Sequence, residues 1–278
     1  MARIFRSRAG FGYRRVMTGS DDRPPRGRAI LRRVRGGFAV SAALLTRLPL
    51  AAPDWAPGEA ARASWAFPFV GAAIGAVAGL AFFLARHLHL GPGLAALLAL
   101  AAGLAVTGAL HEDGLADTAD GFFGGESRAQ KLAIMRDSRH GTYAVLALLL
   151  SLGLRGAALA GIGDPLRAVL ALVAAHAASR ALLPLAASLS RPARNDGLGA
   201  DFGAPTPVLA AAAAAAGGLI SLAALGPIRG LVAFGLAGLM ALAGTELARR
   251  QIGGYTGDVL GAVQQLGEIT MLLAASVR

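Results

Sequence analysis

The chain has 278 residues and a formal net charge of +11, and 55% of its residues are hydrophobic while only 15% are charged. Soluble globular proteins carry about 25% charged residues, so this composition excludes a soluble globular fold and predicts an integral membrane protein. The sequence contains no cysteine, which excludes a disulfide framework and a thiolate metal site.

Residues 1–36 form an arginine-rich segment that holds 11 of the 27 basic residues of the chain, all of them arginine. The segment is also rich in glycine and proline and has no apolar period, so we predict a disordered tail. Ahead of a membrane domain, such a tail indicates a cytoplasmic segment near anionic lipid and an orientation signal. We therefore expect no nucleic-acid partner, which a basic arm on a soluble domain would have indicated, and we assign residues 37–278 to a transmembrane domain.

Seven segments of that domain are apolar over about the 20 residues that a membrane-spanning helix needs. Two of them, 230–248 and 259–277, are weaker because polar side chains enter them. The five stronger segments are 67–85, 93–110, 143–162, 168–188 and 207–225.

The segment 37–50 is shorter than a span and contains Arg47, so we predict an interfacial or re-entrant helix that ends at Pro49. The predicted fold is thus all-α, a polytopic integral membrane helical bundle of about seven transmembrane helices plus this short helix. With seven spans, the N-terminus and three polar loops share one side, which the positive-inside rule makes the cytoplasmic side. The polar loops therefore form one candidate site; they are 111–142, 189–206 and 249–258.

The stretch HEDGLADTADGFFGG, His111–Gly125, carries three aspartates at helical spacing. Asp113, Asp117 and Asp120 occupy positions i, i+4 and i+7, which fall on one face of a helix. Carboxylates this close repel one another unless a cation lies between them, and a divalent metal that holds a phosphate is the usual solution. We predict that these aspartates are catalytic and bind metal; the alternative is that they only solvate the end of a span.

Two details of this stretch qualify the prediction. Glu112 points to a different helix face from the three aspartates, so it is a weaker candidate ligand. Glycines weaken a helix, so we predict that the motif is helical only from Asp113 to Asp120.

Arginines follow in the stretch IMRDSRHGTY, Ile134–Tyr143. Arg136 and Arg139 are candidate substrate-binding residues, because arginine grips a phosphate with two parallel hydrogen bonds. Ordinary juxtamembrane arginines would look the same, so both interpretations stay open.

Two further loops contribute candidates. Asn195 lies in a turn-rich loop, Arg191–Gly203, which is either a polar substrate loop or a plain connector. In the stretch GGYTGDVLG, Gly-rich backbone precedes a helix and can present N–H groups to a phosphate. We take Thr256 of this stretch as substrate-binding and Asp258 as a fourth metal ligand.

Three ionisable residues lie inside predicted spans, where such groups are costly and functional by default. Arg180 lies one turn from His176 and nearer the cytoplasm. It either reaches a substrate phosphate or pairs with an acid such as Glu246 or Glu268 for structure. Arg155 is left without an explanation.

Taken in order, several of these motifs resemble the cobalamin synthase family over about residues 38–275. They are HEDGLADTADG, IMRDSRHGTY, SRALLP, the turn at 196–199 and GGYTGDVLGA. The resemblance implies a bacterial inner-membrane enzyme with its active site toward the cytoplasm. It would join α-ribazole, or α-ribazole phosphate, to adenosylcobinamide-GDP, release GMP and require Mg²⁺.

Under this resemblance, the four aspartates would bind one or two Mg²⁺ ions, or one of them would accept the hydroxyl proton. Arg136 and Arg139 would hold the diphosphate. The partners implied are the two substrates and the lipid bilayer; a homo-oligomer or an association with other corrinoid-pathway enzymes stays open.

Two other functions compete with this one. A CDP-alcohol phosphotransferase also uses spaced aspartates at a membrane surface, and its motif opens D-G-x-x-A-R. Here Asp113-Gly114 is followed by Ala116-Asp117, with no arginine in that place. A secondary transporter would place its acids near the membrane midplane, whereas here they cluster at one surface.

Overall fold

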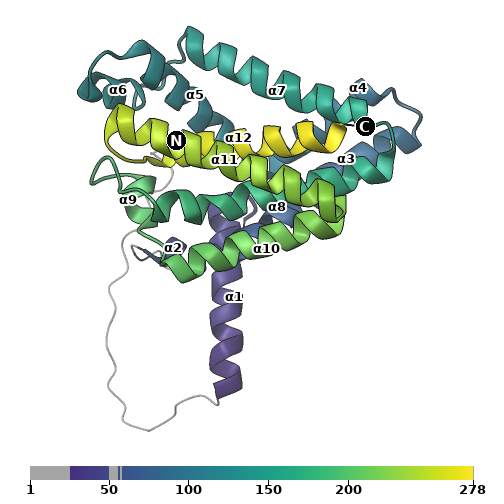
Figure 1. The fold of residues 1–278 in the computed structure, drawn as a ribbon, viewed down its shortest axis with the longest axis horizontal. Helices are drawn as coiled ribbons and strands as arrows, with labels where there is room; N and C mark the ends of the chain where they lie inside the picture. Colours follow the sequence, from purple (N-terminus) through teal and green to yellow (C-terminus); the bar gives the residue numbers. More distant parts are fainter. Residues whose placement is uncertain (1–25, 50–55, 57, 278) are drawn as a thin grey trace. The chain divides into compact units, whose positions relative to one another are not determined.

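The computed structural model describes residues 26–49, 56 and 58–277, and the predicted tail lies outside these residues up to position 25. The chain divides into two units, residues 1–33 and 34–278, and the helical bundle belongs to the second. Every regular element among the described residues is helical (Figure 1), as the composition predicts. The only extended pairing there is an isolated bridge between Pro192 and Tyr255.

Six helical stretches of the described chain are long and apolar enough to cross a membrane. The first is continuous over Glu59–His87 and comprises α2 (Glu59–Ala63), η2 (Ser64–Ala66) and α3 (Phe67–His87). The others are α7 (Thr142–Ile162), α8 (Pro165–Ser188), α10 (Pro207–Leu225), α11 (Pro227–Ile252) and α12 (Gly257–Ser276). These six confirm the corresponding predicted spans, including the two weaker ones.

The predicted span 93–110 is different. Helix α4 (Pro92–Thr107) ends early, and the chain bends by 91° into α5 (Leu110–Gly124). The bend is made by Gly108 and Ala109, which both have left-handed backbone conformations, with φ of 63° and 54°. A left-handed glycine after the last helical residue is a common way to end a helix. The pair counts as a seventh span only if both arms are taken together, and α5 by itself lies outside the six spans.

Helix α5 is longer than predicted, because the prediction confined the helix to Asp113–Asp120. A neighbouring side chain occupies the space beside Gly121, near the end of α5. A Cβ on Gly121 would collide with Met135, just beyond α6 (Arg128–Ile134). Packing of α6 onto this end therefore offsets the low helix propensity of glycine.

Helix α1 runs over Arg26–Leu45, so it begins before residue 37 and ends before Pro49. Residues 26–36, predicted to be disordered, belong to it, in keeping with the high helix propensity of its arginine and alanine residues. Within the second unit, its end is held by Ser41, whose hydroxyl donates to the Ala63 carbonyl at 2.9 Å. The short helix predicted over 37–50 is thus the second half of α1.

Helices α8 and α12 are the most buried of the spans, and in Figure 1 α12 lies between α7 and α8. Small residues allow this packing. Gly71 and Gly75 of α3 lie against the backbone of α8, where a Cβ on Gly75 would come within 2.8 Å of the Val173 Cα. Small residues four apart are the usual means of close helix packing in lipid. Large apolar side chains instead cover the outside of the bundle, as Leu149, Val208 and Ile228 do.

The remaining short helix, α9 (Leu198–Phe202), lies in the loop between α8 and α10. Its Gly199 packs on the backbone at Thr256 and Gly257, at the start of α12. This contact brings the polar loop 189–206 against the polar loop 249–258, at the same end of the bundle as α5.

Candidate active site

The site is built around the crossing of α5 and α12. A Cβ on Gly114 would come within 2.7 Å of the Asp258 carbonyl and 3.2 Å of the Gly261 Cα. The two backbones are therefore in direct contact, which only glycine permits here. Gly114 thereby brings Asp113 and Asp117 beside Asp258.

Asp113 and Asp117 are half-buried and lie one turn apart on α5. Burial, together with the smaller effect of the charges of Asp113, Asp258 and Asp120, raises the pKa of Asp117 to about 7, while Arg194 opposes them. Carboxylates that raise one another's pKa repel. This part of the site therefore favours a bound cation.

Asp258 lies in the first turn of α12, which stabilises a negative charge there. Thr256 caps this helix by accepting from the Val259 N–H at 3.2 Å, and its hydroxyl donates to Asp258 at 3.1 Å. Because Thr256 is only 1% exposed, it orients Asp258 rather than facing an open cleft.

Asp120 is placed differently from the other two aspartates of α5. Its carboxylate accepts hydrogen bonds from the backbone N–H groups of Gly141 and of Ala144, the latter at 2.9 Å. Since these are the free N–H groups at the start of α7, Asp120 caps that helix. It is buried, and its clear contribution is to join α5 to α7.

The predicted polar loops meet at this end of the molecule. Arg128 donates to the Ile252 carbonyl and to the Ala193 carbonyl, each at 2.6 Å. Ala193 in turn donates to the Tyr255 carbonyl at 2.7 Å. Three segments far apart in the sequence are thereby fixed together, as the topology predicted.

The two predicted phosphate-binding arginines have different surroundings. Arg136 forms a two-oxygen ion pair with Asp196 of the next loop, at 2.6 and 2.7 Å. Arg139 is exposed and pairs locally with Asp137, and its hydrogen bonds lower the pKa of that carboxyl to about 2. Asn195 is exposed in the same loop as Asp196.

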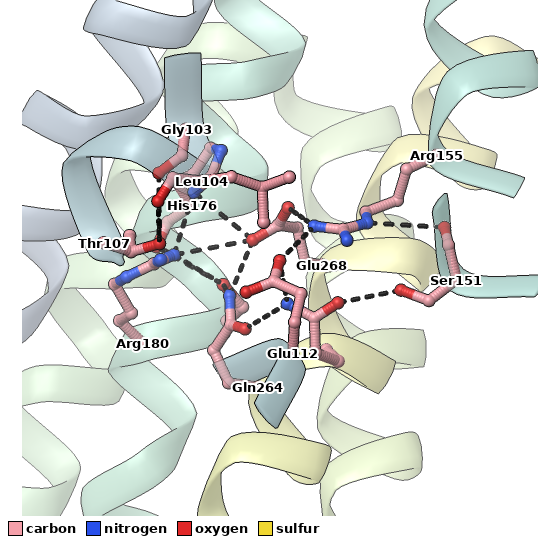
Figure 2. A network of polar contacts seen from close by, with 12 residues as sticks. Gly103, Leu104, Thr107, Glu112, Ser151, Arg155, His176, Arg180, Gln264 and Glu268 are labelled. Atoms are coloured by element: carbon pink, nitrogen blue, oxygen red, sulfur yellow. Dashed lines mark hydrogen bonds and ion pairs between the residues drawn. The ribbon is translucent and has the colours of Figure 1, made fainter. Parts of the chain in front are cut away.

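Arg180 lies away from this surface, in a buried network of polar side chains (Figure 2). Its guanidinium lies 2.9 Å from His176 Nδ1 and 3.5 Å from a carboxylate oxygen of Glu268. Of the two interpretations of Arg180, the structure shows the pairing with an acid, and that acid is Glu268. The other acid considered, Glu246, pairs instead with Arg249 and Arg250.

The comparisons with known proteins agree with these motifs. Residues 37–276 match the cobalamin-5-phosphate synthase family. The chain belongs to that family. Relatives named adenosylcobinamide-GDP ribazoletransferase include one from Bradyrhizobium diazoefficiens, 51% identical over 90% of this chain and 96% of the relative. Another, from Mesorhizobium japonicum, is 47% identical over 88% of this chain and 95% of the relative. No solved structure matches.

The donor set of this cobalamin-5-phosphate synthase family member suits a magnesium ion. Carboxylate oxygens are the ligands that Mg²⁺ prefers, and Mg²⁺ is usually held by one or two carboxylates together with waters and substrate phosphates. Among the residues that the structure describes, no three acidic or histidine side chains converge closely enough to hold an ion by themselves. A fit to Mg²⁺ therefore requires oxygen ligands from a substrate phosphate beside those of Asp113, Asp117 and Asp258.

Arg194 is a residue of this site that sequence reasoning passed over. One guanidinium nitrogen donates to Asp258 at 3.2 Å, and another is buried and has no hydrogen-bond partner among the described residues. It is also the cation that lowers the pKa of Asp117. The only signal in the sequence was its position beside the Asn195 turn, which does not distinguish it from Arg191.

Proposed function

We propose that this protein is an adenosylcobinamide-GDP ribazoletransferase that joins α-ribazole, or α-ribazole phosphate, to adenosylcobinamide-GDP and releases GMP. The single observation that supports this most is the match of nearly the whole chain to relatives of that name. Family membership also speaks against the CDP-alcohol phosphotransferase and the transporter. The buried network encloses a cavity of only about 10 Å³, which has room for about one water molecule and no transported solute.

The reaction forms one phosphorus–oxygen bond and breaks another. The 5′-hydroxyl of the ribazole attacks the phosphorus attached to cobinamide, the bond to the GMP oxygen breaks, and GMP leaves with the electron pair. A carboxylate of the aspartate cluster accepts the hydroxyl proton. Negative charge spreads over the phosphate oxygens as the bonds exchange, and cationic groups stabilise it.

The residues of the chain divide this work. Asp113, Asp117 and Asp258 would hold Mg²⁺ together with a substrate phosphate, and the ion would neutralise phosphate charge. Arg194 and Arg136 lie on the same side and hold the diphosphate, leaving their aspartate partners when it arrives. The main role of Asp120 is to hold α5 against α7, and not to bind the ion.

We also propose that the protein lies in the bacterial inner membrane with this site toward the cytoplasm. The arginines of the loops that meet at the site support this orientation, since basic residues accumulate in cytoplasmic loops. Both substrates would then be reached from the cytoplasm.

GMP release by the purified protein in lipid tests the proposal. We expect release that requires adenosylcobinamide-GDP, α-ribazole and Mg²⁺ together. A folded, lipid-embedded sample that releases no GMP would contradict the assignment, and CMP release from a CDP-alcohol would then be the next assay.

A further inference from the structure

We propose that Glu112 is a positioning residue: through Arg155 and Gln265 it sets how α5 presents Asp113 and Asp117 to Asp258. This inference rests on the proposed function, because it concerns the same carboxylates. Glu112 precedes the aspartates in the sequence yet faces away from them, into the bundle, where it pairs with Arg155.

Arg155 connects three helices through one nitrogen (Figure 2). Its NH1 donates to Glu112 of α5 at 3.0 Å and to Glu268 of α12 at 2.8 Å, while Arg155 itself belongs to α7. This arginine therefore joins the helix that carries Asp113 and Asp117 to the helix that carries Asp258.

A second hydrogen bond ties α5 to α12 directly. Gln265 donates to the same oxygen of Glu112 at 3.0 Å, and its own side-chain oxygen accepts from Ser151 at 2.8 Å. The Glu112, Arg155 and Glu268 side chains are only 10%, 3% and 1% exposed. In such surroundings an unpaired polar group is costly, so these contacts hold firmly.

The consequence is geometric. Successive residues of a helix point about 100° apart, so an anchored Glu112 fixes the direction in which Asp113 points, and Asp117 follows one turn later. The contact of Gly114 with Gly261 sets how closely α5 approaches α12. Rotation and separation of the two helices are thus set by two different contacts, and Glu112 determines the rotation.

The test uses Glu112→Gln, which keeps the shape of the side chain and removes the charge that holds Arg155. Binding of Mn²⁺, a paramagnetic substitute for Mg²⁺, is measured by electron paramagnetic resonance on protein in lipid nanodiscs, with adenosylcobinamide-GDP present to supply phosphate oxygens and α-ribazole omitted so that no turnover occurs. We expect the Kd for Mn²⁺ to rise about tenfold, the usual effect of removing a group that orients metal ligands. The exchanged pair Glu112→Gln with Gln265→Glu restores a carboxylate and a hydrogen bond between α5 and α12, so its Kd should return to within about twofold of wild type.

Ser221→Ala serves as the matched control. Ser221 is fully buried, and its hydroxyl donates only within α10, to the Gly217 carbonyl at 2.8 Å. Unchanged Mn²⁺ binding in Glu112→Gln, or an equal loss in Ser221→Ala, would overturn the positioning role while leaving the proposed function intact. A wild-type protein that binds no Mn²⁺ would instead overturn the metal site of the proposed function and this inference with it.

Discussion

Helices α5 and α12 share two clusters of charged side chains, and the clusters differ in how their charges are balanced. In the buried cluster, Glu112 and Glu268 face Arg155 and Arg180, so that two negative groups meet two positive ones. In the cluster at the polar end, Asp113, Asp117 and Asp258 face Arg194, and negative charge is in excess.

The difference shows which cluster serves structure and which serves chemistry. A buried charge is tolerated when a partner of opposite sign compensates it, and the deep cluster meets that condition. Surplus charge of one sign in a partly exposed position is costly unless a ligand neutralises it, which is why such groups mark functional sites. The largest effects on activity and on stability should therefore come from different clusters.

Substitution of the half-buried aspartates should have the largest effect on activity. Asp117→Asn removes one ligand charge, and we expect GMP release to fall at least about 10³-fold with little change in thermal stability. Asp164→Asn is the matched control, because asparagine also caps helices well and Asp164 caps α8 at its Arg167 N–H. Normal turnover in Asp117→Asn would remove that residue from the site.

Substitution of Arg155 should have the largest effect on stability. Arg155→Met leaves Glu112 and Glu268 buried without this partner, so we expect the free energy of unfolding to fall by about 3–5 kcal/mol. The exposed pair of Arg136 and Asp196 should be worth less than about 1 kcal/mol. Denaturant titration of Arg155→Met and Arg136→Met in micelles measures both, and equal losses would contradict the distinction between the clusters.

Arg194 should contribute to substrate binding. Arg194→Ala removes charge-assisted hydrogen bonds worth about 1.5–3 kcal/mol each, so kcat/KM for adenosylcobinamide-GDP should fall about 10- to 100-fold. Arg191→Ala is the control, since the Arg191 side chain is exposed and donates one long hydrogen bond, to the Gly253 carbonyl at 3.4 Å. A loss confined to Arg191→Ala would shift the phosphate contact to that residue.

The effect of pH on Mg²⁺ binding should be smaller, and it should follow the ionisation of Asp117. Because its pKa is raised to about 7, Asp117 is mostly protonated at pH 6 and ionised at pH 8, and only the ionised form binds metal. The half-saturating Mg²⁺ concentration should therefore be about tenfold higher at pH 6 than at pH 8. Thermal stability titrated with Mg²⁺ at both pH values measures this, and equal half-saturation would show that Asp117 is not a ligand.

The raised pKa of Asp117 also predicts how the stability of the metal-free protein changes with pH. A carboxyl whose pKa is raised in the folded state binds its proton more tightly there than in the unfolded chain. Its stabilising effect is present below about pH 4 and is lost as the pH rises through 7. Mg²⁺ should thus raise the melting temperature more at pH 8 than at pH 6.

Local patterns in the sequence predicted most of the fold. The apolar segments located the spans to within a few residues, because burial in lipid demands a continuous apolar run that is visible in the sequence. The break between α4 and α5 escaped this reasoning, since apolar residues continue through Gly108 and only the backbone conformation changes there. The three aspartates share a helix as predicted, but α5 extends past them because α6 packs on its glycines.

The sequence by itself determined the membrane bundle, the grouping of the polar loops and the family, since these depend on composition, periodicity and motifs read along the chain. The tertiary structure alone decided which charges meet. In the structure Asp120 accepts a hydrogen bond from the start of α7, Arg180 pairs with Glu268, and Arg155 pairs with Glu112. These pairings join helices that are far apart in the sequence, and their energies depend on burial and distance, which no local pattern contains.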